Sequence, residues 1–149
     1  MQTNEKKQFP KTRGQIYLAT ADGYRKDFMK IGFTMRHTDT RMTELDKSSG
    51  QGTKGYNVLA RFYVKNPKQF EKKLHCYFDS DRQDTRREWF NNMSIERFYE
   101  GVLHNAHISD IKLLLKRLIR ESYDQSIISM IEAYIQSYNM DKINKSELK

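Results

Sequence analysis

Five residues whose side chains suit phosphate chemistry are spread over the first half of the chain: Tyr17, Lys30, Arg41, Glu71 and His75. Hydrolysis of a phosphodiester needs a cation that offsets charge on the phosphate, an activated water and a group that stabilises the leaving oxygen. One carboxylate can hold Mg²⁺ when water and phosphate oxygens complete its octahedron, and a guanidinium binds phosphate through a planar fork of donors. These residue types therefore suffice for phosphodiester hydrolysis if the fold brings them together.

Each of these residues also has a purely structural interpretation. Tyrosine favours strands whatever its function, so Tyr17 alone indicates packing. Lys30 lies in an otherwise apolar segment, where alternation alone would turn it to solvent. Arg41 and Glu71 could form a surface ion pair without a catalytic role. The functional interpretation therefore depends on the elements that position them.

The first half of the chain predicts a β-hairpin, a helix and a third strand. Residues 15–20 and 28–33 are strand-like and are separated by a polar turn around Gly23. Thr38 is a good helix N-cap, and the serines and glycines of residues 48–52 end the helix. Apolar side chains then alternate from residue 56 to residue 65, which is the period of a half-buried strand.

A second helix follows Asn66 and Pro67, which supply an N-cap and a first-turn proline. Its apolar face carries Phe70, Leu74, and Tyr77 or Phe78. Glu71 and His75 are four residues apart, so they share one face of this helix. Residues 79–87 are expected to form a loop, after which Trp89 and Phe90 return to the core. Ser94 then caps a short helix.

The last third of the chain predicts two amphipathic helices, over residues 108–120 and 127–138. Such a hairpin buries its apolar stripe against the main domain or against a second copy of the chain. The residues leave both arrangements open, and a homodimer through residues 107–140 is one of them.

The motifs Gln15-Ile16-Tyr17 and Lys30-Ile31-Gly32 sit on the two hairpin strands, and residues 87–90 read Arg-Glu-Trp-Phe. Together with Arg41 on the next helix and Glu71 and His75 on the helix after Pro67, they resemble the GIY-YIG endonuclease superfamily. The resemblance is to a phage and bacterial branch in which lysine replaces the second tyrosine, and it covers about residues 14–100.

The resemblance implies a role for each matching residue in a metal-dependent DNA endonuclease of phage, mobile-element or defence origin. Glu71 matches the ligand of Mg²⁺ (or Mn²⁺), with one ion per site, and Arg41 matches the arginine that contacts the scissile phosphate. Tyr17 matches the general base or orienter of water, which Lys30 would tune by lowering its pKa. His75 would assist or contact DNA, and Gly32 and Glu88 are supporting residues, with Glu88 expected to pair with a neighbouring arginine.

Composition agrees with a nucleic-acid partner. The 149 residues include 27 Lys and Arg against 19 Asp and Glu, a net charge of +8, and 37% are hydrophobic, too many for a disordered chain. Residues 1–100 carry +7 of this charge (20 Lys and Arg, 13 Asp and Glu). The expected partner is DNA, with RNA left open, and the residues expected to contact it are Lys47, Lys54, Arg61, Lys72, Arg86 and Arg87.

The element order predicts an α/β (α+β) fold with a small three-stranded, mainly antiparallel sheet flanked by helices and followed by a C-terminal helical hairpin. The expected organisation is a flexible basic segment (1–13), a GIY-YIG-like nuclease domain (14–104), a helical hairpin (107–140) and a flexible tail (141–149). No apolar run is long enough for a membrane span and no signal peptide is visible, so a cytoplasmic protein is expected.

Two other functions compete with the nuclease. Leu45 stands where many members of the superfamily carry His or Tyr, which favours an inactive nucleic-acid-binding module of the same fold. The C-terminal helices favour an interaction or inhibitor protein. Loss of cleavage with retained DNA binding would indicate the first, and loss of function on deleting residues 107–149 with nuclease activity retained would indicate the second.

Overall fold

A computed structural model describes residues 13–35, 55–83 and 86–147. The chain divides into two compact units, Met1–Val102 and Leu103–Lys149, and each is described by itself. Arg41, Lys47, Lys54 and Leu45 lie outside the described residues, as does the predicted helix that begins near Thr38.

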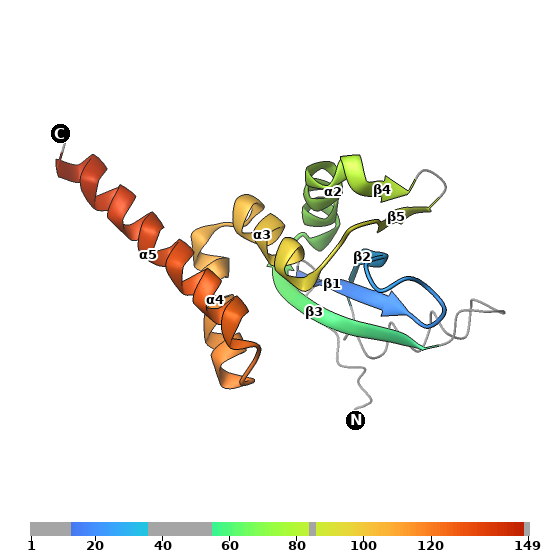
Figure 1. The fold of residues 1–149 in the computed structure, drawn as a ribbon. Helices are drawn as coiled ribbons and strands as arrows, with labels where there is room; N and C mark the ends of the chain where they lie inside the picture. Colours follow the sequence, from blue (N-terminus) through green and yellow to red (C-terminus); the bar gives the residue numbers. More distant parts are fainter. Residues whose placement is uncertain (1–12, 36–54, 84–85, 148–149) are drawn as a thin grey trace, which may run out of the picture. The chain divides into compact units, whose positions relative to one another are not determined.

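An antiparallel five-stranded sheet forms the centre of the first unit (Figure 1). Its strands, in chain order, are β1 (Arg13–Ala21), β2 (Met29–Thr34), β3 (Tyr56–Lys65), β4 (Arg82–Gln83) and β5 (Arg86–Phe90). The spatial order is β3-β1-β2-β5-β4. The α+β class and the hairpin of the first two strands are therefore confirmed, whereas the predicted count of three strands is wrong.

Of the two additional strands, β4 and the first two residues of β5 lie in the segment 79–87 that was expected to be a loop, and the rest of β5 is the segment expected to return to the core. Phe90 pairs with Met29 and Trp89 with Lys30, so β5 extends the sheet beyond β2. Residues 79–81 form a 3-10 turn, and β4 pairs back onto β5. The sequence does not predict β4 because a two-residue strand is too short to show alternation. It does not predict β5 because the pairing of β5 with β2 depends on contacts distant in sequence.

The strand register sorts the side chains onto two faces. Directly opposed residues of an antiparallel pair point to the same face, so Tyr17 shares a face with Gly32 and Ala19 shares it with Lys30. The opposite face carries Phe62, whose ring lies 5.2 Å from that of Phe70 on the following helix. The Phe62 face is therefore the one that this helix covers.

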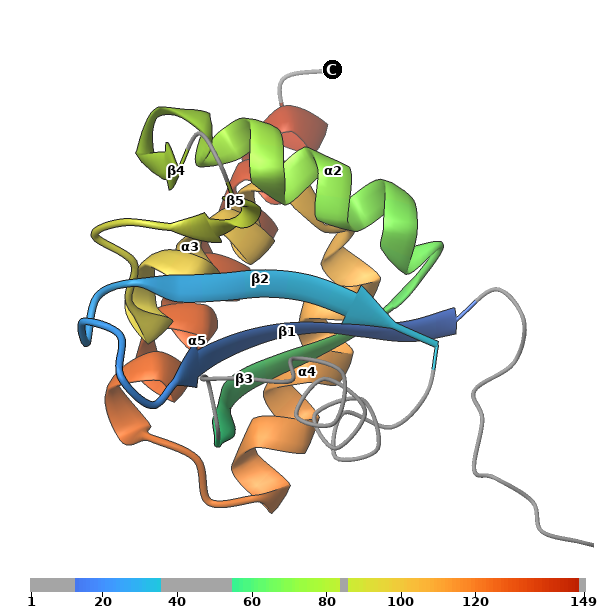
Figure 2. The ribbon, with the colours of Figure 1, turned by 90° about the vertical axis from the view of Figure 1, so that its right-hand side faces the viewer.

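Helix α2 (Pro67–Tyr77) runs alongside the sheet (Figure 2). Pro67 begins the helix as predicted, but Asn66 does not cap it with its side chain. Asn66 instead adopts a left-handed backbone conformation (φ 50°), and its carbonyl accepts the N–H groups of Gln69 and Phe70. Phe78 is the buried member of the aromatic pair that ends the apolar face.

Helix α3 (Ile95–Asn105) follows β5 and begins at the predicted cap, because the Ser94 hydroxyl accepts the Arg97 backbone N–H at 3.1 Å. Its Gly101 lies against α2, where a Cβ would come within 2.7 Å of the Phe78 ring. A larger residue at position 101 would therefore separate the two helices.

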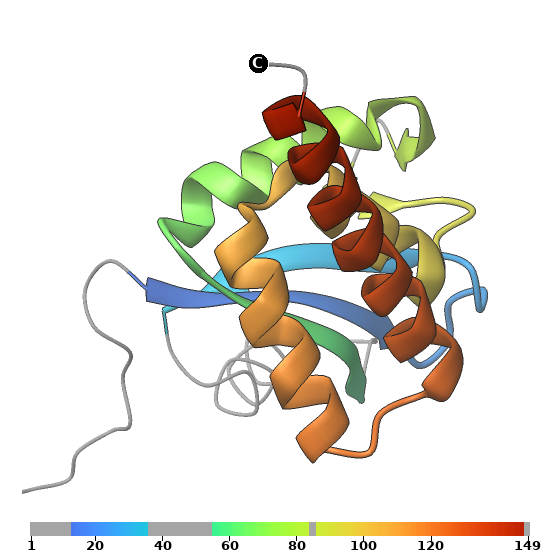
Figure 3. The same cartoon turned by 90° about the vertical axis from the view of Figure 1, so that its left-hand side faces the viewer.

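The second unit contains α4 (Ile108–Arg120) and α5 (Gln125–Glu147), which lie side by side (Figure 3). Both helices were predicted, and α5 continues beyond the expected end of the hairpin at residue 140, over most of the segment expected to be a flexible tail. Asp124 caps α5, with its carboxylate accepting the Ser126 backbone N–H at 2.8 Å. No helix within the described ranges has the length and apolarity that crossing a membrane requires.

Candidate functional site

Tyr17 and Gly32 face each other across β1 and β2 in a contact that only glycine allows. The Tyr17 side chain is 1% exposed and lies directly over Gly32. A Cβ at position 32 would be 2.5 Å from the Tyr17 hydroxyl oxygen and 2.7 Å from its Cζ. Gly32 therefore lets the tyrosine hydroxyl approach the backbone of β2, which gives the glycine of the second motif a physical role.

Lys30 is two residues before Gly32 on the same face of β2, and it is buried (6% exposed) rather than turned to solvent. Its ammonium nitrogen is 3.5 Å from Oε2 of Glu88 and 5.9 Å from the centre of the Tyr56 ring. A buried ammonium requires such compensation, because leaving it unpaired would cost several kcal/mol. The structure thus pairs Glu88 with Lys30.

Trp89 fixes the position of Glu88 next to Lys30. The indole is 8% exposed, and its ring centre lies 4.9 Å from that of Tyr24 and 5.0 Å from that of Phe28. Burial of an aromatic side chain contributes about 2–3 kcal/mol. Trp89 and Phe90 are core anchors as predicted, and their pairing with β2 brings Glu88 to the site.

Glu71 is the buried carboxylate of the site, on the face of α2 that meets β2. The residue is 9% exposed, and its Oε2 has no hydrogen-bond partner among the described residues. The pKa of Glu71 is raised from 4.5 to about 7, mainly by burial and also by the nearby Glu88 carboxylate, while the Lys30 ammonium and the Phe33 backbone N–H oppose the rise. Glu71 therefore lies in one electrostatic cluster with Lys30 and Glu88.

His75, one turn after Glu71, is held by the backbone of β2. Its Nε2 is 3.0 Å from the Ile31 carbonyl oxygen, which can only accept, so Nε2 carries a proton and donates it. Burial lowers the pKa of His75, and the bond to Ile31 opposes this shift. The imidazole is therefore neutral at pH 7, with Nδ1 as its acceptor. This bond gives His75 a positioning role between α2 and β2.

The two polar side chains of α2 thus reach β2 where β5 no longer pairs with it. Because β5 pairs with only the first two residues of β2, the backbone groups of Ile31 and Phe33 need other partners. His75 serves the carbonyl of Ile31, and the Glu71 carboxylate interacts with the N–H of Phe33. Glu71 and His75 lie on one face of α2, as their spacing of four residues predicts, and this face contacts the backbone of β2.

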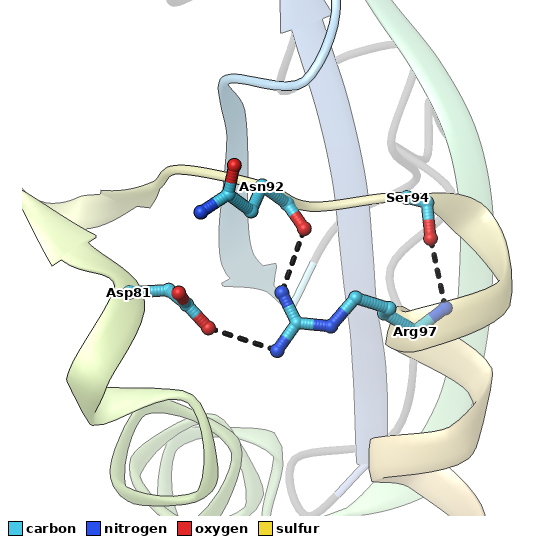
Figure 4. A network of polar contacts seen from close by, with 4 residues as sticks. All are labelled: Asp81, Asn92, Ser94 and Arg97. Carbon is cyan, nitrogen blue, oxygen red and sulfur yellow. Dashed lines mark hydrogen bonds and ion pairs between the residues drawn. The ribbon is translucent and has the colours of Figure 1, made fainter.

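A polar network that the sequence does not reveal connects α3 to the turn after α2 and to the end of β5 (Figure 4). Arg97 of α3 donates to the Asp81 carboxylate at 2.8 Å and to the Asn92 carbonyl at 2.6 Å. The Asp81 carbonyl accepts the backbone N–H of Asn91, which directly follows β5. The turn after α2 and the end of β5 are therefore joined, which fixes the helix carrying Glu71 relative to the strand carrying Glu88.

The structure brings together six of the predicted site residues around β2: Tyr17, Lys30, Gly32, Glu71, His75 and Glu88. Arg86 and Arg87 belong to β5, but their side chains are outside the described part of the chain, as is all of Arg41. Arg61 opposes Tyr17 on the neighbouring strand, whereas Lys72 is exposed on α2. These two predicted DNA contacts consequently lie on opposite sides of the sheet.

The donor set of the site fits one divalent cation with few protein ligands. A buried carboxylate oxygen without a hydrogen-bond partner is an available ligand, and Mg²⁺ commonly binds one or two carboxylates and keeps several waters. Within the described ranges, no three or more His, Cys, Asp or Glu side chains gather as a metal cage. Water and phosphate oxygens would therefore supply the other coordination positions.

Comparison with known proteins identifies a family. Neither the curated proteins nor the solved structures give a match. The family model of the T5orf172 domain matches residues 14–106, which include all of the described strands apart from Arg13 at the start of β1, and the helices α2 and α3. This domain is found in GIY-YIG-like and nuclease-associated proteins. The chain therefore belongs to the T5orf172 domain family.

Proposed function

We propose that this protein is a divalent-metal-dependent DNA endonuclease of the GIY-YIG type, in the branch that carries lysine at the second motif. The observation that carries the proposal is Glu71, a buried carboxylate with an oxygen that lacks a hydrogen-bond partner, beside the buried Lys30. Membership of a nuclease-associated domain family supports it. We further propose a phage, mobile-element or defence origin and a cytoplasmic location.

Each residue has a task in this proposal. Glu71 would hold Mg²⁺ or Mn²⁺, which stabilises charge on the phosphate when bound. Lys30 keeps a fixed positive charge at the site, and Gly32 lets the Tyr17 hydroxyl lie against β2, where it would orient or deprotonate water. His75 fixes α2 through Ile31. Arg41 is proposed to contact the scissile phosphate.

Cleavage of supercoiled plasmid with Mg²⁺ or Mn²⁺ tests this function. We expect nicking or linearisation by the wild type, and none by Glu71→Gln or Tyr17→Phe. Glu100→Gln is the matched control, since Glu100 is an exposed glutamate on α3. A parallel reaction with single-stranded RNA shows whether the substrate is DNA. Intact nucleic acid in every metal would contradict the proposal.

A second candidate is an inactive nucleic-acid-binding module of the same fold. The 1% exposure of Tyr17 favours it, because a group that acts on water must reach water. The module predicts a gel shift without cleavage, and a salt dependence of binding that is the same in wild type and Glu71→Gln.

We also propose that two copies associate through residues 107–140. Two large apolar side chains of α4, Leu113 and Ile119, are 56% and 52% exposed. Paired copies would place two sites on one DNA and permit cleavage of both strands. Light scattering tests this: a monomeric wild type would contradict it, and Leu113→Lys should dissociate a dimer. Loss of function on deleting these helices, with cleavage retained, would instead favour the interaction-protein alternative.

A further inference from the structure

The site contains more negative charge than one metal ligand requires. Glu71 and Glu88 supply two carboxylates, and Lys30 is a cation that lies with them among the described residues. When both carboxylates are ionised, these three groups together carry one net negative charge. Two neighbouring carboxylates repel each other when both are ionised, and either a shared proton or a bound cation relieves this repulsion.

The two carboxylates differ in how they meet solvent. Glu71 is 9% exposed and its Oε2 lacks a hydrogen-bond partner among the described residues. The Glu88 side chain is 44% exposed, and its contact with Lys30, at 3.5 Å, is longer than the 2.7–2.9 Å of a close charge-assisted bond. Glu88 is therefore held near the buried carboxylate while part of it remains open to solvent and to an arriving ion.

We propose that Glu88 is a second carboxylate of the metal site, binding the same divalent cation as Glu71, directly or through a coordinated water. Lys30 holds Glu88 in place before the cation arrives. The inference rests on the proposed nuclease function and deepens it, because it gives Glu88 a role that a single-ligand site does not need.

Charge balance favours two carboxylates over one. With a divalent cation bound, Glu71, Glu88 and Lys30 total one positive charge, which matches the single negative charge of a phosphodiester. Without Glu88 the total would be two positive charges in a largely buried site, which is costly to desolvate. The second carboxylate therefore favours capture of the metal before DNA binds.

Manganese binding to the full chain without DNA tests this role, by titration calorimetry or by the electron paramagnetic resonance of free Mn²⁺. We expect Glu88→Gln to weaken Mn²⁺ binding at least about tenfold, Glu71→Gln to abolish it, and Glu100→Gln to leave it unchanged. Lys30→Met, which removes both a positive charge and the contact that holds Glu88, is the reference for a second comparison. Circular dichroism verifies the fold of every variant.

Glu88→Gln leaves the buried Lys30 ammonium unpaired and could therefore unfold the chain. The double variant Lys30→Met/Glu88→Gln avoids this cost, and its comparison with Lys30→Met isolates Glu88. Equal Mn²⁺ affinity in these two variants would overturn the inference while the nuclease proposal stands. Absence of Mn²⁺ binding and of metal-dependent cleavage in the wild type would overturn both.

Discussion

Glu71→Gln should change the pH dependence of stability, because this substitution removes a carboxyl whose pKa is higher in the folded chain than in the unfolded chain. Burial raises the pKa of Glu71 from its ordinary value of 4.5 to about 7 in the folded protein. Between these two values the folded chain binds more protons than the unfolded chain, so the wild type loses stability as pH rises from 4.5 to 7. Above pH 7 the loss is complete.

The size of this effect follows from the two pKa values. A difference of one pKa unit corresponds to about 1.4 kcal/mol, so Glu71 should cost up to about 3 kcal/mol at pH 8 relative to pH 4. Glutamine does not titrate and lacks this slope. The free energy of unfolding of Glu71→Gln, relative to wild type, should therefore increase by about 2–3 kcal/mol across the interval.

Urea denaturation of both proteins at several pH values between 4 and 8, without divalent metal, measures this difference. Titrating groups that do not interact with Glu71 cancel in the comparison, and Glu100→Gln, at an exposed position on α3, is the matched control. A flat difference for Glu71→Gln as well would refute the burial of an ionisable carboxylate at this position. Millimolar Mn²⁺ at pH 8 should stabilise the wild type and Glu100→Gln but not Glu71→Gln.

Three further predictions concern contacts around the site and in the second unit. Gly32→Ala should lower the free energy of unfolding by about 1–3 kcal/mol and reduce plasmid nicking, because the added methyl displaces Tyr17; an unchanged denaturation midpoint would contradict the close contact. Arg97→Ala should lower the free energy of unfolding, measured with urea, by about 1–3 kcal/mol, since it breaks the bonds to Asp81 and to the Asn92 carbonyl. Because Asp81 and Arg97 share a bond, the double variant with Asp81→Ala should lose less stability than the sum of the two single variants. Asp124→Ala should lower the helicity measured by circular dichroism at pH 7. Hydrogen bonds from Ser126 lower the pKa of Asp124 from its ordinary value of 3.8. The difference in helicity between wild type and variant should therefore disappear only as the pH falls below 3.8.

The sequence predicts the elements whose signal is local. Alternation identified the strand of residues 56–65, and the spacing of four placed Glu71 and His75 on one face of α2. The caps at Ser94 and the proline at α2 were also visible, because these interactions span only a few residues.

Pairings between distant segments were not predictable in the same way. Lys30 and Glu88 are 58 residues apart, and no periodicity connects them, so a neighbouring arginine looked like the better partner for Glu88. The strands β4 and β5 were missed for the same reason. The contacts of the His75 and Glu71 side chains with the backbone of Ile31 and Phe33 could not be predicted either, because a backbone group is the same in every residue type.

The family motifs compensated for part of this gap. They predict that Tyr17, Lys30, Gly32, Glu71 and Glu88 belong to one site. In the structure these residues lie around β2. The Asp81–Arg97 network belongs to no motif, so only tertiary structure could reveal it.

The central claim is that Glu71 supports metal-dependent hydrolysis of DNA, and the nicking rate of supercoiled plasmid tests it most directly. Wild type and Glu71→Gln are compared with Mn²⁺ at pH 8, where the Glu71 carboxyl is ionised. The account predicts metal-dependent nicking by the wild type and a rate at least about 100-fold lower in Glu71→Gln. Equal nicking by the two proteins, or no cleavage by the wild type despite a DNA gel shift, would contradict it.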